Sequence, residues 1–274
     1  MEFGLSTYYF ISERLTAHLL DKILKAGITQ IEIFAARQHL DYHDPNHIRD
    51  VAQWFKDQNL KPHSLHAPLY GDFDWGRSGG APISVTHLER RYRIDSMEEI
   101  KRAIEVAERL PFQYLILHLG LPEEEYSIER YDAALTSLEH LKIYAKERGA
   151  QILLENVPNQ LTTPDRLLQF IQYSRMDDMR ICFDTGHAHL ATGVQPAFET
   201  LKSRILSTHV HDNLRDKDAH LLPFEGNIDW TETVRGFRSV DGQFPILFEV
   251  RNYGSGVPDL TGVRDVIERM KAIS

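Results

Sequence analysis

Short apolar segments alternate with helical segments along the whole chain. Each apolar segment has the length and residue types of a buried strand, and the residues after it carry apolar side chains at the 3.6-residue spacing of a helix. The expected strands cover residues 3–10, 30–35, 61–68, 114–120, 151–157, 180–184, 205–211 and 245–250. The expected helices cover residues 14–26, 47–58, 96–110, 128–148, 164–173 and 196–203, a segment opened by Asp229 and Trp230, and residues 260–273. Strands that are apolar on both sides and separated by helices indicate a parallel sheet covered on both faces.

Eight strand–helix units predict an α/β protein folded as a single closed (β/α)₈ TIM barrel. A chain of 274 residues can bury one large core, so we expect one domain over residues 1–274. A doubly wound open sheet is the alternative, and it would be expected to carry a nucleotide-binding fingerprint. The sequence contains neither G-x-G-x-x-G nor a P-loop, which favours the barrel.

One segment, residues 70–94, interrupts the alternation. It is rich in Gly, Pro, Asp and aromatic residues, and we expect a long loop that lies over the barrel like a lid. An insert that only caps the barrel is the alternative.

The charge and the apolar pattern narrow the classes of partner. The formal net charge is −9, so the chain as a whole repels a phosphate backbone and a nucleic acid is not an expected partner. Membrane association and secretion are not expected either, because no apolar run approaches the roughly 20 residues that span a bilayer and the N-terminus lacks the regions of a signal peptide. The single cysteine, Cys182, precludes an internal disulfide and fits a reducing compartment, so we expect a cytoplasmic protein.

Residue types that bind metals or transfer protons follow the ends of several expected strands. Taken one at a time, a histidine here could be a hydrogen-bonded core residue, and a loop acid could be solvated. The C-terminal ends of barrel strands converge on one cup, however, so we expect these side chains to meet. Buried carboxylates that face one another need compensation, and a divalent cation provides it. The residues are His66, His118, Glu155, Asp184, His187, His209, His211, Asp212 and Glu249, with Asp218 and His220 in the loop after the seventh strand.

The positions sort the expected ligands into groups. Glu155, Asp184, His209 and Glu249 lie on four successive strands and offer oxygen and nitrogen donors without a thiolate, which suits Mn²⁺, Co²⁺, Mg²⁺ or Zn²⁺. One ion is expected, and the remaining residues leave room for as many as three. A second ion would lie between Glu155 and the pair His66 and His118, and a third among His187, Asp218 and His220.

Several motifs resemble the xylose isomerase-like barrels, a superfamily that includes sugar epimerases and isomerases, inosose dehydratases and zinc-dependent AP endonucleases. The matching segments are S-L-H-A-P, I-L-H-L-G, L-L-E-N-V, C-F-D-T-G-H-A, H-V-H-D-N, D-A-H, E-G-N-I-D-W and L-F-E-V, which together cover essentially the whole chain. The resemblance to ketose epimerases implies that Glu155, Asp184, His209 and Glu249 bind one metal and that the two glutamates form an acid–base pair. The resemblance to AP endonucleases implies that five further residues complete a three-zinc cluster, namely His66, His118, His187, Asp218 and His220. One departure is Phe224, where many relatives have Gly.

Because the chain is acidic, we expect a small polyhydroxylated substrate. The hypothesis is a metal-dependent isomerase or epimerase of a keto-sugar or related polyol that acts through proton abstraction and an enediolate. His187, Arg215 and Trp75 are the expected substrate contacts. The alternatives are a keto-sugar or cyclitol dehydratase or lyase, an AP endonuclease-like zinc phosphodiesterase, and a metal- or sugar-binding barrel without turnover. The sequence leaves the oligomeric state open, a homo-oligomer included.

Overall fold

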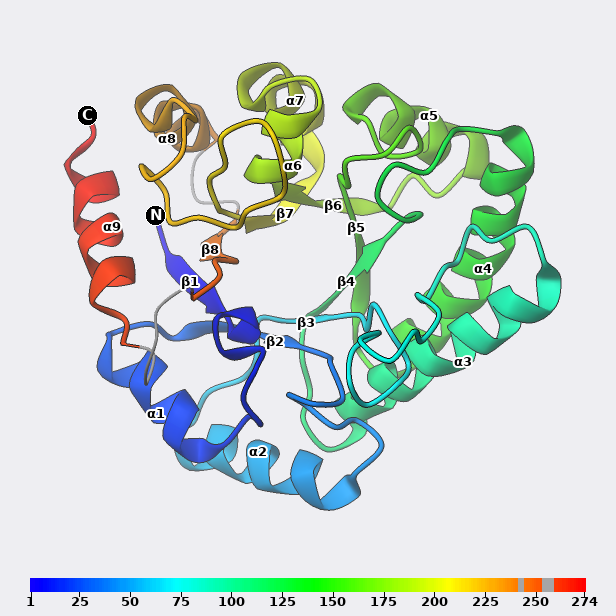
Figure 1. Cartoon of the computed structure of the whole chain (residues 1–274), viewed down its shortest axis with the longest axis horizontal. Coiled ribbons are helices and arrows are strands. Elements are labelled where there is room, and N and C mark those ends of the chain that lie inside the picture. The colour runs from blue at the N-terminus through cyan, green and yellow to red at the C-terminus, as the bar shows by residue number, and fades with distance from the viewer. Residues whose placement is uncertain (241–243, 253–258) are drawn as a thin grey trace.

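The computed structural model describes residues 1–240, 244–252 and 259–274, and within them eight parallel strands form one ring. Neighbouring strands follow the order β7-β6-β5-β4-β3-β2-β1-β8. The helices lie around the outside of this ring (Figure 1). The strands are β1 (Phe3–Ser6), β2 (Gln30–Phe34), β3 (Ser64–His66), β4 (Tyr114–His118), β5 (Gln151–Glu155), β6 (Arg180–Asp184), β7 (Ile205–His209) and β8 (Ile246–Phe248).

Residues just beyond β7 join the first and last strands of this order. Val210 donates a backbone hydrogen bond to Leu247 at 2.8 Å, and Glu249 donates one to Val210 at 3.2 Å. A parallel bridge pairs Val210 with Phe248. The ring therefore closes as a TIM barrel, and the open doubly wound sheet is excluded.

The helices are α1 (Ala17–Lys25), α2 (Pro45–Asp57), α3 (Arg90–Glu105), α4 (Ile128–Glu147), α5 (Pro164–Ser174), α6 (Thr185–Leu190), α7 (Val194–Leu201), α8 (Trp230–Ser239) and α9 (Thr261–Ala272). Their start signals are local. Asp44, which directly precedes Pro45, accepts a hydrogen bond from the backbone N–H of Asn46. Asp229 accepts one from the backbone N–H of Glu232. The expected helices are confirmed, with ends that differ by a few residues. Among the described residues, none of the helices is both long enough and apolar enough to cross a membrane.

Two local expectations were wrong, and one helix was not expected. Residues 7–10 form a 3-10 turn instead of the second half of β1, because the side chain of Ser6 accepts the backbone N–H of Tyr8. The insert ends at Glu89, since α3 already begins at Arg90 and not at residue 96. The short helix α6 directly follows β6, because the Asp184 carboxylate caps it through the backbone N–H of His187.

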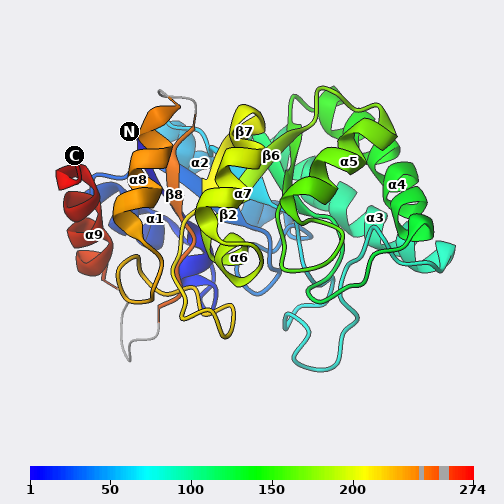
Figure 2. The same ribbon diagram turned by 90° about the horizontal axis from the view of Figure 1, so that it is seen from above.

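Alternation along the strands places a polar layer above an apolar one inside the barrel. Ile116, Leu153 and Cys182 pack together in the lumen. His118, Glu155 and Asp184 lie two residues further along the same strands, so their side chains face the same lumen at its C-terminal end. The insert and the loop after β7 project from one end of the barrel (Figure 2). The fold therefore gathers the expected ligands beneath these loops.

Candidate metal centre

In the described part of the chain, three groups of side chains each bring their donor atoms within 4.8 Å of one another, and the first two groups share Glu155 and His209. The first group is Glu155, Asp184, His209 and Glu249, the second is His66, Glu155 and His209, and the third is His187, His211, Asp218 and His220. The side chains come from β3, β5, β6, β7, the loop after β7 and the residue after β8, together with α6. Residues spread over most of the chain thus meet at one place.

His209 Nδ1 lies at the middle of the first group. It is 3.2 Å from Glu155 Oε1, 3.6 Å from Glu249 Oε2 and 4.0 Å from Asp184 Oδ2. Donors that share one ion at bond lengths of about 2.0–2.2 Å stand roughly 3–4 Å apart. The spacing of this group therefore matches one cation with three carboxylates and one imidazole.

The other expected ligands surround Glu155 and Asp218. Glu155 Oε2 lies 3.2 Å from His118 Nε2 and 3.5 Å from His66 Nε2. Asp218 Oδ2 lies 3.2 Å from His187 Nε2 and 3.1 Å from His220 Nε2. His187 Nδ1 is also 3.2 Å from Glu155 Oε1, so its ring links the two clusters.

His211 joins the third group, although sequence reasoning named it only as a residue at a strand end. Its Nε2 lies 3.1 Å from Asp184 Oδ1 and 3.7 Å from Asp218 Oδ1. Its ring stacks on that of His220 with a centroid distance of 4.0 Å. His211 is fully buried, so it contacts both acids from beneath the centre.

Several buried donor and acceptor atoms of the centre point at one another without a hydrogen bond. Among the described residues, no hydrogen-bond partner reaches either oxygen of Glu155, Nδ1 of His209, Nδ1 of His187 or Oε1 of Glu249. Leaving such atoms unsatisfied costs about 1–3 kcal/mol each, and more when the group is charged. A divalent cation would satisfy them together, and the oxygen and nitrogen donors suit Mn²⁺, Co²⁺, Mg²⁺ or Zn²⁺.

The outer ring nitrogens of three histidines are held by acceptors. His66 Nδ1 donates to the Ala67 carbonyl at 2.8 Å, and His220 Nδ1 donates to the Glu249 carbonyl at 2.7 Å. His209 Nε2 lies 3.1 Å from the Glu32 carboxylate. This arrangement leaves the other nitrogen of each ring free to face the acids, as metal-binding histidines require.

Glu32 was missed by sequence reasoning. It is fully buried on β2, and its signal in the sequence was an acid within the apolar strand I-E-I-F. Charged residues are almost never fully buried without a partner, so an acid in the middle of this apolar strand indicates a buried polar partner.

The charges of the centre shift the pKa values of its two glutamates in opposite directions. Burial alone would raise the pKa of Glu155, but the imidazoles of His209 and His118 hold it well below its ordinary value. Burial raises the pKa of Glu249 above its ordinary value, although His209 and His220 oppose the shift. Glu155 therefore favours the carboxylate form, and Glu249 takes up a proton more readily.

Buried polar side chains hold the framework of the centre. Asp212 does not face the expected ion. Instead its carboxylate accepts hydrogen bonds from the backbone N–H groups of Asn213, Phe224, Gly226 and Ile228 and from the indole of Trp230. Asp212 thus fixes the loop that carries Asp218 and His220. Phe224 keeps that loop tight by adopting φ 76°, a left-handed conformation that glycine takes without strain.

A cavity of about 200 Å³ opens onto the centre. His66, His118, His187, Asp218, His220 and Glu249 line its polar side. Tyr8, Phe34 and Trp75 form an aromatic wall, and Leu69, Tyr70, Pro82 and Ile83 cover it from the insert side. Arg215 is exposed in the loop after β7 and is not among the lining residues, so its contact with substrate stays a prediction.

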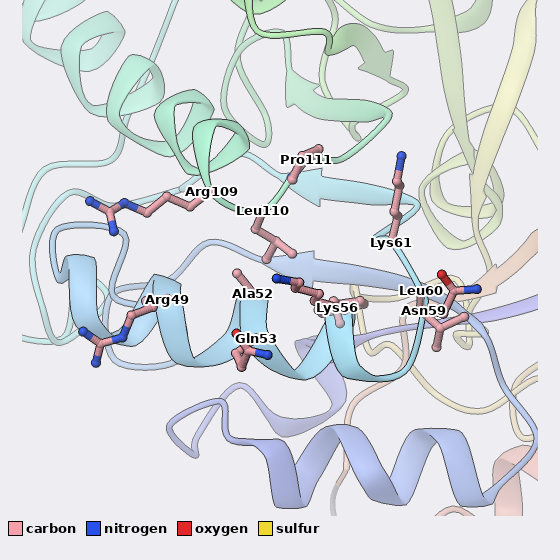
Figure 3. Close-up of a pocket in the computed structure, with 11 residues that line it drawn as sticks. Arg49, Ala52, Gln53, Lys56, Asn59, Leu60, Lys61, Arg109, Leu110 and Pro111 are labelled. Carbon is pink, nitrogen blue, oxygen red and sulfur yellow. The ribbon is translucent and has the colours of Figure 1, made fainter.

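A larger cavity of about 540 Å³ lies at the opposite end of the barrel, next to the segments that lead into β3 and β4. The basic residues that line it are Arg49, Lys56, Lys61 and Arg109. In Figure 3, Arg49 and Arg109 extend to the left of the view while Lys61 lies at its right, so these charges do not converge on one point. None of the residues grouped around the carboxylates lines this cavity, so we place the functional site at the C-terminal end.

Comparison with known proteins agrees with the barrel fold. A family model described as xylose isomerase-like TIM barrel matches residues 20–273. The chain belongs to this family. A D-tagatose 3-epimerase-like protein has the same fold with a TM-score of 0.78, and it is 26% identical over 100% of this chain and 98% of that one.

One further solved structure shares the fold of this xylose isomerase-like barrel, and one further sequence is similar to it. The IolI protein with a bound zinc atom has a TM-score of 0.77 and 15% identity, covering 99% of this chain and 96% of that one. An uncharacterized protein of Methanocaldococcus jannaschii is 27% identical, covering 98% of this chain and 90% of that one.

Proposed function

We propose that the chain is a divalent-metal-dependent isomerase or epimerase of a keto-sugar or related polyol. The observation that carries this proposal is the convergence of Glu155, Asp184, His209 and Glu249 beside a small cavity that Glu249 lines. The likeness to a D-tagatose 3-epimerase-like protein supports the same class of chemistry. We also propose that residues 1–274 act as one domain.

The two glutamates have the arrangement that proton transfer at a carbon next to a ketone requires. A divalent cation held by the four residues would polarise the substrate ketone and stabilise the negative charge that develops on its oxygen. Glu249 lines the cavity and so can reach the carbon that loses its proton. Glu155 does not line the cavity, but one of its oxygens lies within 4.8 Å of a Glu249 oxygen, and we propose that it serves as the second carboxylate of the acid–base pair.

The cavity sets the size and shape of the substrate. About 200 Å³ is small compared with the roughly 300–1,000 Å³ of sites for drug-sized ligands, so it suits a single sugar unit. Trp75 and the apolar side chains of the insert cover the cavity opposite the acids. We propose that Trp75 packs on the carbon face of the sugar and that His187 binds its hydroxyl groups.

Solvent exchange tests the proposal directly. Protein loaded in turn with Mn²⁺, Co²⁺, Mg²⁺ or Zn²⁺ is incubated with ketopentoses and ketohexoses in deuterium oxide, and deuterium in the sugar is followed by NMR. We expect exchange at the carbon next to the ketone, and Glu249→Gln should lower its rate by about 10²–10⁴-fold. Glu232→Gln, on the exposed face of α8, is the matched control. Exchange at the wild-type rate in Glu249→Gln would refute the two-carboxylate mechanism.

One observation favours a second candidate, an AP endonuclease-like zinc phosphodiesterase. All nine residues that the resemblance assigns to a three-zinc cluster lie together in the described structure. The net charge of −9 and the small cavity favour the sugar substrate. Elemental analysis of the purified protein separates the two functions, because a single Mn²⁺ or Co²⁺ per chain supports the epimerase and three Zn²⁺ support the phosphodiesterase. Cleavage of DNA at abasic sites provides the direct assay.

A further inference from the structure

A buried carboxylate on the far side of the barrel contacts the central histidine of the proposed metal centre. Glu32 belongs to β2 and His209 to β7, and the ring order places β1 and β8 between these strands. Glu32 Oε2 nevertheless lies 3.1 Å from His209 Nε2, so the contact crosses the lumen. Both side chains are fully buried.

The neighbouring strand fixes the Glu32 side chain. Ser64 is the register partner of Glu32 on β3, and its hydroxyl donates to Glu32 Oε2 at 2.7 Å. The same oxygen therefore receives the hydroxyl of Ser64 and faces the ring of His209. This pair of contacts gives Glu32 one orientation in the lumen.

The chemistry of the two groups decides which nitrogen of His209 is free. An ionised carboxylate only accepts hydrogen bonds, so His209 must donate to it from Nε2. A neutral imidazole carries one N–H, which leaves the lone pair on Nδ1. Nδ1 is the atom that lies 3.2 Å from Glu155 Oε1 and 3.6 Å from Glu249 Oε2.

We propose that Glu32 is a positioning residue that fixes the ring and the tautomer of His209 so that Nδ1 binds the divalent cation. This inference rests on the metal centre of the proposed function, but not on the identity of the sugar. His66 and His220 are held by backbone carbonyls, whereas His209 is held by a carboxylate. A carboxylate is the stronger acceptor and makes the ligating nitrogen more basic.

Metal affinity tests the role without any substrate. The dissociation constant for Zn²⁺ is measured by competition with a chelator in the wild type, Glu32→Gln, Ser64→Ala and Ser207→Ala. We expect Glu32→Gln to bind Zn²⁺ about 10–100-fold more weakly, because an amide can also donate to Nε2 and release the tautomer. Ser64→Ala should weaken binding less. Ser207→Ala, which removes a hydroxyl partner of His63 in the same lumen, should bind as the wild type does.

A spectroscopic measurement separates positioning from a general loss of structure. In the zinc-loaded wild type, nitrogen-15 NMR should show His209 protonated at Nε2 and metal-bound at Nδ1. The opposite tautomer, or unchanged zinc affinity in Glu32→Gln, would overturn the proposal while leaving the metal centre intact. Absence of zinc binding in the wild type would overturn both.

Discussion

Asn156, which directly follows β5, exchanges two hydrogen bonds with Asp184, the last residue of β6. The Asn156 side chain donates to the Asp184 carbonyl at 2.8 Å, and the Asp184 backbone N–H donates to the Asn156 side-chain oxygen at 2.8 Å. Both residues are buried. An amide side chain supplies a donor and an acceptor at once, so this exchange holds the end of β6 where the Asp184 carboxylate faces the centre.

Replacing Asn156 with Asp should destabilise the protein. Aspartate keeps the acceptor, but it loses the donor and places a negative charge against the Asp184 carbonyl. We expect the free energy of unfolding to fall by about 1–3 kcal/mol, measured by urea denaturation. Asn59→Asp, at an exposed position, is the control. Equal unfolding midpoints for Asn156→Asp and the wild type would contradict this account.

Removal of the proposed metal ion should destabilise the protein as well. Without a cation, the carboxylates of Glu155, Asp184 and Glu249 face one another in a buried site. A ligand at 1,000 times its dissociation constant stabilises the folded state by about 4 kcal/mol. We expect a chelator to lower the thermal unfolding temperature, and we expect addition of excess divalent cation to restore it. A melting curve that is identical with and without chelator would argue against a bound ion.

Gly186 makes room for His211. A Cβ atom at residue 186 would lie 1.9 Å from His211 Cε1, so Gly186→Ala must displace the imidazole from Asp184. Alanine is the better helix former by about 1 kcal/mol, so any loss of stability comes from this contact. We expect Gly186→Ala to unfold at a lower temperature and to bind zinc more weakly. Gly236→Ala, in α8, is the control: its Cβ would lie 3.3 Å from the end of the Gln195 side chain and 3.5 Å from the Phe198 ring, so it should fold normally.

At position 224, replacement by glycine should leave the protein more stable than replacement by alanine. Its left-handed backbone is strained for any residue with a Cβ, by roughly 1–2 kcal/mol, whereas glycine adopts it freely. The ring packs against the Arg269 guanidinium at 3.8 Å, which recovers about 0.5–2 kcal/mol at this partly buried site. Phe224→Ala loses the ring and keeps the strain, whereas Phe224→Gly loses both. We therefore expect Phe224→Gly to be the more stable of the two in urea denaturation, and the reverse order would show that strain is negligible.

His39 should make the protein sensitive to mild acid. Its side chain is fully buried, and burial lowers its pKa from 6.5 to about 4. Between these values the unfolded chain binds a proton that the folded protein does not, so stability falls as the pH decreases through this window. The contribution is about 2 kcal/mol between pH 7 and pH 5. In His39→Gln this part of the pH dependence should be absent, as measured by urea denaturation at both pH values, with the exposed His18→Gln as control. An unchanged pH slope would contradict the burial argument.

The strands and the candidate ligands at their ends were accessible from the sequence because both depend on local patterns. Glu155 and Asp184 close apolar runs, and the barrel rule then brings such ends together. Glu32 was not accessible in this way, because its partner His209 lies across the lumen and only the closed ring shows that they meet. The helix α6 was missed because six residues carry too little periodicity. His211 became part of the centre only through the space that Gly186, which has no Cβ, leaves for its ring.

The loop between β7 and α8 takes its course from the Asp212 carboxylate, which binds mainly peptide N–H groups. Every amino acid except proline supplies such a group. Apart from Gly226, where a Cβ would lie 2.3 Å from Asp212 Oδ1, and Phe224, whose backbone is left-handed, side chains along this rim can therefore change through evolution or directed mutagenesis while the path of the main chain is retained. The barrel can thus acquire new selectivity here without rebuilding the scaffold that carries Asp218 and His220.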